Sequence, residues 1–296
     1  MNKALKVFSY IFGVLIIGAL LSYPAYLLAQ EIPFLAHYRF GRVSNRVFMI
    51  LAIVGLIPFF KKLKNINFKK SGLIWDKKLW ARHFTLGYIY GLSTMLLMGL
   101  LLSYTGVRPW REVIEVNVMI GALLKGFLAG FIISLIEEPL FRGVLFQSLS
   151  KQYSRVFAII SISAVFACVH FFKSKSGTIT DVHWYSGFIH LKNAFYLWES
   201  PRIIGAVLTL FAVSVFMHLT VLKNGNLIAA IGIHTGWVNA IKVIKKFSIN
   251  NDNTWMLSNY DRVTGYVAFA WITVLIIIYV LINKKKIFAK DETCED

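Results

Sequence analysis

The feature that most constrains this chain is a pair of adjacent glutamates, Glu137 and Glu138, inside the apolar run FLAGFIISLIEEPLFRGVLF. Of the 14 Asp and Glu residues in the chain, only these two lie within a long hydrophobic segment. A carboxylate in hydrocarbon costs several kcal/mol unless it has a partner or faces water. Two such acids side by side therefore predict a functional site within the membrane.

The composition excludes an ordinary soluble domain, because 57% of the residues are hydrophobic, only 16% are charged, and several apolar runs are too long for a globular core. A window of about 20 apolar residues finds candidate spans at 7–28, 47–60, 85–106, 118–149, 156–172, 202–222, 226–245 and 263–282. We therefore expect an all-α fold, with about eight transmembrane helices in one bundle around an intramembrane cavity. Residues 1–296 would form a single transmembrane domain.

The formal net charge of +18 is explained by membrane orientation, because the basic residues cluster in short loops. Residues 61–84 hold eight Lys and Arg residues against one acid, Asp76, so this loop is predicted to be cytoplasmic. Eight spans then place both termini in the cytoplasm. The expected partner is the lipid bilayer and no nucleic acid is expected, while the oligomeric state stays open.

One connection, residues 173–201, is unusual because it mixes charged residues and histidines with many aromatic residues. Such a blend suits the boundary between lipid and water. An interfacial helix or lid is one interpretation. A plain belt of aromatic side chains at the membrane surface is the simpler one, since aromatic residues favour this depth.

The spacing around the acidic pair separates the two carboxylates. Glu138 and Arg142 are four residues apart and share a helix face, whereas Glu137 points about 100° away. Pro139 lacks an amide donor and its ring clashes with the carbonyl of Leu135, so we expect the helix to bend there and expose backbone polar groups. A structural ion pair is the alternative interpretation, but one acid would suffice for it.

Two further apolar segments carry polar side chains that suit hydrolysis. The fifth predicted span has Phe166 and His170 at i, i+4 spacing, and the seventh has His234 and Asn239. Together with the acidic pair and its arginine, these segments supply two carboxylates, two imidazoles, a guanidinium and an amide. This inventory matches metal-assisted or general-base hydrolysis of a peptide bond.

Other polar groups within the predicted spans have simpler explanations. We expect His218 to make a hydrogen bond between helices and Lys125 to extend its amine to the membrane surface. The sequence contains no HExxH, GxGD or GxSxG motif, which other intramembrane hydrolases would need. The glutamate and histidine set is therefore the one candidate for chemistry.

The order EExxxR, then FxxxH, then a helix carrying GIHTGWVNA resembles the three signature motifs of the CPBP family. This family includes the CAAX prenyl endopeptidases, among them the eukaryotic Ras-converting enzyme, and bacterial relatives linked to bacteriocin processing and self-immunity. The resemblance covers about residues 118–245 and leaves 1–117 and 246–296 as peripheral spans and loops. It implies an eight-helix endopeptidase in the bacterial cytoplasmic membrane that cleaves a membrane-associated peptide or protein tail.

The resemblance also implies a role for each matching residue. Glu137 would activate water together with His170, Glu138 and Arg142 would hold the site, and His234 would stabilise the oxyanion. Whether zinc takes part stays open. If it does, its ligands would be Glu137, His170 and His234.

One position departs from the family pattern. The third motif usually has Asn or Asp four residues after its histidine, but here that residue is Val238, and Asn239 lies five residues on. Five residues turn about 140° past the histidine's face, so Asn239 would reach the site only through a local bulge at Gly236. Two alternatives therefore stay open: a proton- or cation-coupled transporter, and a catalytically weak immunity or scaffold protein of the same fold.

Overall fold

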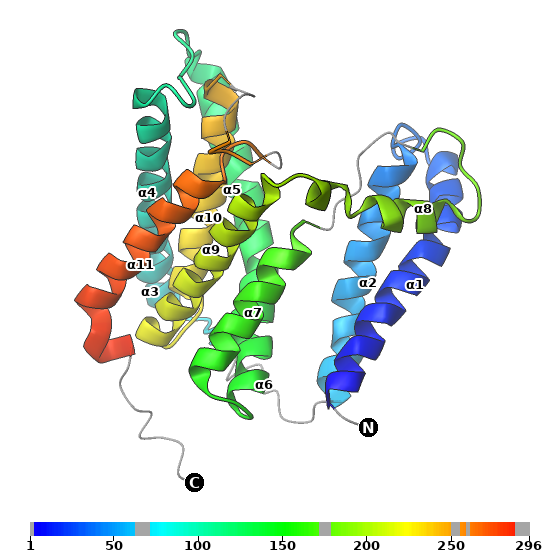
Figure 1. The fold of residues 1–296 in the computed structure, drawn as a ribbon, viewed down its shortest axis with the longest axis horizontal. Helices are drawn as coiled ribbons and strands as arrows, with labels where there is room; N and C mark the ends of the chain where they lie inside the picture. The colour runs from blue at the N-terminus through cyan, green and yellow to red at the C-terminus, as the bar shows by residue number, and fades with distance from the viewer. Residues whose placement is uncertain (1–2, 63–71, 172–178, 250–254, 259–260, 288–296) are drawn as a thin grey trace. The chain divides into compact units, whose positions relative to one another are not determined.

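The computed structural model describes residues 3–62, 72–171, 179–249, 255–258 and 261–287, and its regular elements in these ranges are all helices (Figure 1). The α-helices are α1 (Lys3–Glu31), α2 (Phe40–Lys62), α3 (Lys77–Leu79), α4 (Thr85–Tyr104), α5 (Val116–Glu138), α6 (Phe146–Ser150), α7 (Arg155–Val169), α8 (Ser186–Asn193), α9 (Ile203–Asn224), α10 (Ile228–Phe247) and α11 (Tyr266–Ile287). Two π-helices, η2 (Trp80–Phe84) and η3 (Pro139–Leu145), and a 3₁₀-helix, η4 (Tyr196–Glu199), complete them. The predicted all-α class is confirmed.

Five helical segments of the described chain are long and apolar enough to cross a membrane: Phe12–Glu31, Lys77–Tyr104, Val116–Ser150, Ile203–Asn224 and Tyr266–Ile287. The chain is therefore an integral membrane protein, as predicted. Helices α2, α7 and α10 coincide with the other three predicted spans. The count of eight spans, the cytoplasmic termini and the bacterial inner membrane stay predictions, and residues 63–71 of the predicted cytoplasmic loop lie outside the described residues.

Contacts divide the chain into two compact units, Met1–Ile66 with Val169–Pro201, and Asn67–Cys168 with Arg202–Asp296. The single domain over 1–296 stays a prediction. In the first unit, Gly187 of α8 packs against the backbone of Ala19 of α1. Helix α8 lies in the aromatic-rich connection 173–201, so a helix is present there, while residues 172–178 lie outside the described part.

A histidine on α8 is buried against α2. His190 is 3% exposed, its Nε2 lies 3.0 Å from Oδ1 of Asn45, and its ring stacks on Phe48. Burial lowers the pKa of His190 to about 4 from its ordinary value of 6.5. The imidazole is therefore neutral at pH 7, with Nε2–H donating to the Asn45 oxygen.

This burial predicts an acid-sensitive first unit. The unfolded chain takes up a proton on His190 below about pH 6.5, whereas the folded chain resists it down to about pH 4, so folded-state stability falls with pH across that window. His190→Gln keeps a donor for Asn45 but does not titrate. We expect the melting temperature to fall less between pH 7.5 and 5.0 in this variant than in the wild type, measured by thermal unfolding in detergent. Equal slopes would contradict the assignment.

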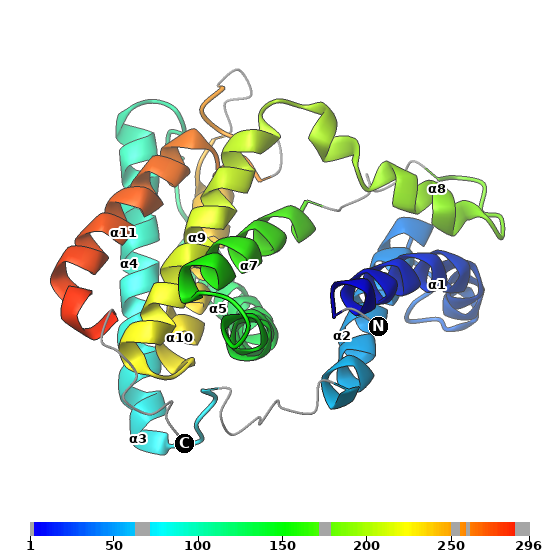
Figure 2. The ribbon, with the colours of Figure 1, turned by 60° about the horizontal axis from the view of Figure 1, so that its bottom comes forward.

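The second unit is built around α10, with α4 and α5 on either side of it (Figure 2). Gly87 and Gly91 of α4 face the backbone of α10, and Gly232 and Gly236 of α10 face the backbone of α4. A Cβ at Gly236 would lie 2.5 Å from the carbonyl oxygen of Tyr88. Small residues one turn apart on both helices therefore allow the two backbones to touch, as is common between helices in membranes.

The α4–α10 contact makes a specific prediction about stability. Gly236→Ala should destabilise the protein by about 1–3 kcal/mol, because the added methyl group forces backbones apart in a closely packed site. Gly121→Ala on α5 is the matched control, since a Cβ there would meet no atom within 4 Å. SDS-induced unfolding in mixed micelles measures both variants. Equal free energies of unfolding for the two variants would contradict a close backbone contact at Gly236.

Candidate functional site

The acidic pair lies where the helix changes its winding. Helix α5 ends at Glu138, and the π-helix η3 begins at Pro139. Proline has no amide hydrogen and its ring opposes the carbonyl of Leu135, so the α-helical hydrogen bonding is interrupted here. The sequence predicted a disturbance at this proline, and the structure has it as a π-helical segment in which four successive residues are buried: Phe141, Arg142, Gly143 and Val144.

Glu138 is the central group of the site. Its side chain is fully buried, with Oε2 lying 3.4 Å from Nε of Arg142 and Oε1 lying 2.8 Å from Nδ1 of His234. A carboxylate accepts hydrogen bonds, so Nδ1 of His234 donates. The ion pair between Glu138 and Arg142 that the sequence predicted is present, and it extends to α10 through the imidazole.

The second nitrogen of the imidazole faces the other acid. Nε2 of His234 lies 3.9 Å from Oε2 of Glu137, whose side chain is 23% exposed. This distance exceeds that of a direct hydrogen bond. The ring of His234 therefore lies between consecutive carboxylates, tied to the buried one and facing the more exposed one.

The arginine is held by aromatic rings as well as by its acid. Arg142 is 1% exposed, and its guanidinium carbon lies 4.5 Å from the ring centroid of Phe166 and 5.8 Å from that of Phe141. The two rings meet edge to face at 5.0 Å. A cation over a desolvated ring is stabilised by the ring's quadrupole. Phe166 of the FxxxH motif thus connects α7 to the acidic motif through Arg142.

Two other predicted site residues need separate description. His170 is half-buried directly after the last residue of α7, in the segment assigned to the first unit, and its role stays a prediction. Asn239 donates from Nδ2 to the hydroxyl of Tyr88 at 2.7 Å, and its side chain lies against Gly126, about three turns before Glu138 on α5. Its catalytic role also stays a prediction.

Helix α10 runs without interruption from Ile228 to Phe247, so the bulge considered at Gly236 does not occur. Because the helix is regular, the residue five positions after His234 turns away from the histidine's face. Val238, four positions on, lies against Gly130 of α5 instead. The regular geometry of α10 therefore explains why Asn239 contacts Tyr88.

The predicted hydrogen bond of His218 to another helix was wrong. Its Nδ1 donates to the carbonyl oxygen of Ser214 at 2.8 Å, one turn earlier on the same helix, and its ring packs 5.1 Å from that of Phe146. An in-helix carbonyl competes well for a histidine donor because it lies at the right spacing without any neighbouring helix. Lys125 is exposed, as expected for a side chain that extends towards the membrane surface.

A hydroxyl pair that the sequence reasoning missed joins the same two helices. Oγ of Ser134 lies 3.0 Å from Oγ1 of Thr235, and both hydroxyls are buried. Ser134 precedes Glu138 by one helical turn, and Thr235 follows His234 directly. The i, i+4 spacing of Ser134 and Glu138 was the signal that could have revealed a continuous polar face on α5.

The predicted metal ligands can be compared with the arrangement of donor atoms. Within the described ranges, no group of three or more His, Cys, Asp and Glu side chains is arranged to hold a metal ion. In the second unit, Nε2 of His234 and Oε2 of Glu137 face each other, but Nδ1 is engaged by Glu138. Catalytic zinc sites use three protein ligands, so these two atoms alone do not complete a site; zinc stays a prediction, and we derive no step through a metal.

A comparison with known protein families found a match over the central segment. Residues 119–240 match the family model described as Type II CAAX prenyl endopeptidase Rce1-like. The match confirms the resemblance that the three motifs indicated, over somewhat less than half of the chain. No curated protein and no solved structure matched the chain. An Rce1-like segment implies a hydrolase of the CAAX protease type within the membrane.

The stack of Arg142 on Phe166 predicts an energetic coupling. In a double-mutant cycle with Phe166→Leu and Arg142→Met, we expect a coupling free energy of about 1–2 kcal/mol, because the desolvated cation–π contact exists only when both wild-type residues are present. SDS-induced unfolding in mixed micelles gives the four free energies. Phe247→Leu, a buried site at the far end of α10, replaces Phe166→Leu in the control cycle and should couple by less than about 0.5 kcal/mol. Equal couplings would contradict the contact.

Proposed function

We propose that this protein is an intramembrane endopeptidase of the CAAX type that hydrolyses a peptide bond in a membrane-associated peptide or protein tail. The observation that carries the proposal is the imidazole of His234 between Glu138 and Glu137, at 2.8 Å and 3.9 Å. The Rce1-like match over residues 119–240 supports the reaction class.

The charges of the cluster favour a particular working state. With both glutamates ionised, Arg142 and a protonated His234 make the four groups neutral in sum. A neutral sum lowers the cost of holding ionised side chains at membrane depth. In this state Nδ1 donates to Glu138, and Nε2 carries a hydrogen towards the side of Glu137.

The spacing between His234 and Glu137 suits a water molecule. With hydrogen bonds of about 2.8 Å to both atoms, a water spanning 3.9 Å would subtend an angle of about 90°. Oε2 of Glu137 is then placed to accept a proton from that water. The side chain of Glu137 is 23% exposed, unlike the fully buried Glu138, although its Oε2 is itself covered, so water and substrate would reach the carboxylate from its exposed part.

The proposed reaction uses Glu137 as the base. It takes one proton from water while the hydroxide oxygen bonds to the carbonyl carbon of the scissile peptide, and Nε2–H of His234 stabilises the resulting oxyanion. The C–N bond then breaks, and the proton held by Glu137 passes to the leaving amine. Glu138 acts through His234 by fixing the orientation of its ring, and Arg142 with Phe166 holds Glu138.

His170 is proposed to assist the activation of water, as its place in the FxxxH motif implies. Zinc binding by Glu137, His170 and His234 stays a prediction. The chemistry assigned to Glu137, Glu138 and His234 does not use a metal.

Glu137→Gln tests the base directly. It should lower cleavage by about 10²- to 10⁴-fold, since the amide cannot accept the proton of water, while the protein stays folded. Peptide cleavage by the purified protein in proteoliposomes is measured with a farnesylated CAAX peptide and with an unprenylated membrane peptide. Glu112→Gln, which removes an exposed carboxylate from the same unit, is the control and should leave the rate unchanged.

The same preparation separates the alternatives. Retained cleavage in Glu137→Gln would contradict the assignment of the base. Ion or proton flux without cleavage in the wild type would favour a transporter. Absence of both activities would favour an immunity or scaffold protein.

A further inference from the structure

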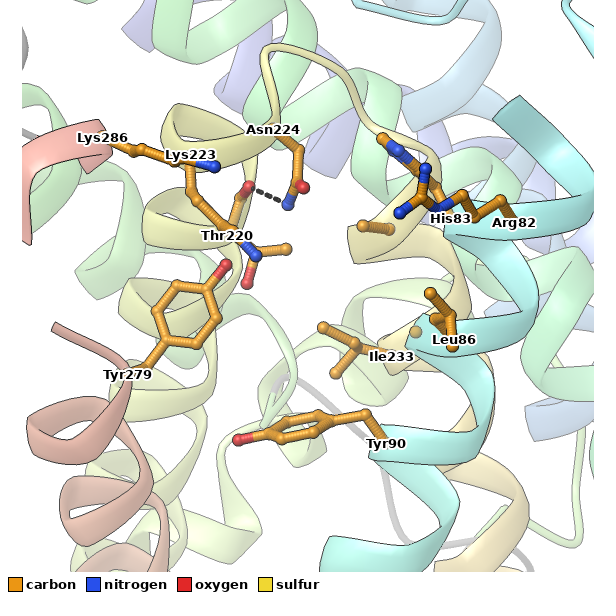
Figure 3. Close-up of a pocket in the computed structure, with 12 residues that line it drawn as sticks. Arg82, His83, Leu86, Tyr90, Thr220, Lys223, Asn224, Ile233, Tyr279 and Lys286 are labelled. Carbon is orange, nitrogen blue, oxygen red and sulfur yellow. Dashed lines mark hydrogen bonds between the residues drawn. The ribbon is translucent and has the colours of Figure 1, made fainter. Parts of the chain in front are cut away.

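A second candidate site lies in the same unit, away from the acidic cluster. A cavity of about 480 Å³ opens between η2 with the start of α4, the ends of α9 and α11, and one face of α10. Ligand pockets for small molecules have about this volume. Figure 3 shows Lys223, Thr220 and Tyr279 on one wall, facing Arg82 and Leu86 on the other.

The mouth of this cavity is cationic. Arg82 comes from η2, Lys223 from the last turn of α9 and Lys286 from the last turn of α11. Among the described residues that line the cavity, none is Asp or Glu. Three like charges around one space repel each other, so an anion bound between them would relieve that repulsion.

The chemistry changes from charged to apolar along the cavity wall. On η2 and α4, Arg82 is followed one turn later by Leu86 and two turns later by Tyr90, so the three share a face. Ile233 of α10 adds to the apolar part, and the Leu86 side chain is 59% exposed. Tyr279 lies about two turns inside Lys286 on α11. A ligand of matching shape has an anionic head and an apolar tail.

The cavity also lies at the level of the membrane where such a ligand would be found. Its cations lie near the start of one candidate membrane span, Lys77–Tyr104, and at the ends of two others, Ile203–Asn224 and Tyr266–Ile287. Span ends lie at the level of lipid headgroups, whereas residues one or two turns further in reach the hydrocarbon. Basic pockets between helices at this level suit lipid phosphates.

We propose that this cavity binds an anionic phospholipid, with the phosphate between Arg82, Lys223 and Lys286 and the start of an acyl chain along Leu86 and Tyr90. The hydroxyl of Tyr279 points into the cavity in Figure 3. The site is separate from the acidic cluster, because Ile233 lines the cavity while the next residue, His234, contacts Glu138 on another face of α10.

Lipid binding to the purified full-length protein tests this assignment. The probes are phosphatidylglycerol, phosphatidylcholine and inorganic phosphate, each titrated into the detergent-solubilised protein and followed by native mass spectrometry. We expect phosphatidylglycerol to bind more tightly than either of the others. The triple variant Arg82→Gln, Lys223→Gln, Lys286→Gln should weaken its binding on the order of 100-fold, because each cation near the lipid phosphate contributes about a factor of five.

The matched control removes three charges without touching the cavity. Lys77→Gln, Lys78→Gln, Lys285→Gln changes exposed lysines on α3 and α11 that do not line it, and it should bind phosphatidylglycerol as the wild type does. Equal losses of phosphatidylglycerol affinity in both triple variants would mean that binding depends on general surface charge, and would overturn the proposed site. Inorganic phosphate that binds as tightly as phosphatidylglycerol, or phosphatidylglycerol that binds the Arg82 triple variant unchanged, would also overturn it.

Leu86→Gln tests the apolar part of the proposal. Replacing the leucine places an amide against the acyl chain, so phosphatidylglycerol should bind at least fivefold more weakly, whereas binding of a short dicaproyl analogue should change less. Because Leu86 is exposed, the substitution is compatible with folding, which size-exclusion chromatography checks. Equal effects on both lipids would contradict an acyl chain along this wall.

Discussion

The buried carboxylate of Glu138 contacts Arg142 through one oxygen and His234 through the other. Ionised side chains at this depth are stable only together, because loss of one partner leaves an uncompensated charge in a medium of low dielectric constant. Phe141 and Phe166 extend the same network by covering the guanidinium. One carboxylate thus connects α5 with η3, α7 and α10, and the orientation of His234 depends on it.

Helix α10 can carry polar groups because other helices shield it. Fifteen of its 20 residues are buried, and the glycines of α4, α5 and α10 bring the backbones into contact. Such close packing leaves little room for lipid at His234 or Thr235. Because it is enclosed, α10 can be less apolar than α9 or α11. This explains why α9 and α11 qualify as membrane spans by their apolarity and α10 does not.

Different faces of α10 are assigned to different chemistry. Ile233 contributes to the cationic cavity and His234 to the acidic cluster, although the two residues are adjacent. Consecutive helical residues point about 100° apart, so a lipid and a peptide substrate would meet the same helix without competing for the same side chains. The two places also suit different ligands: the proposed lipid phosphate would lie at the cationic mouth, and the proposed attacking water would lie at the cluster of Glu137, Glu138 and His234.

The sequence by itself determined the membrane class, the helical fold, the pairing of Glu138 with Arg142 and the disturbance at Pro139. These depend on apolar length, i, i+4 spacing and the missing amide of proline, which are local properties of the chain. The order of its motifs also indicated a resemblance of the central segment to the CPBP family, and the Rce1-like match over residues 119–240 agrees with it.

Only the tertiary structure decided that His234 lies between the two glutamates, that Phe166 covers Arg142 and that Asn239 turns to Tyr88. The cavity between η2, α9 and α11 could not be predicted from local sequence either, since its three cations come from segments far apart in the sequence. The physical reason is that helix packing, set here by glycine contacts, fixes the rotation of each helix about its axis. That rotation determines which polar side chains meet.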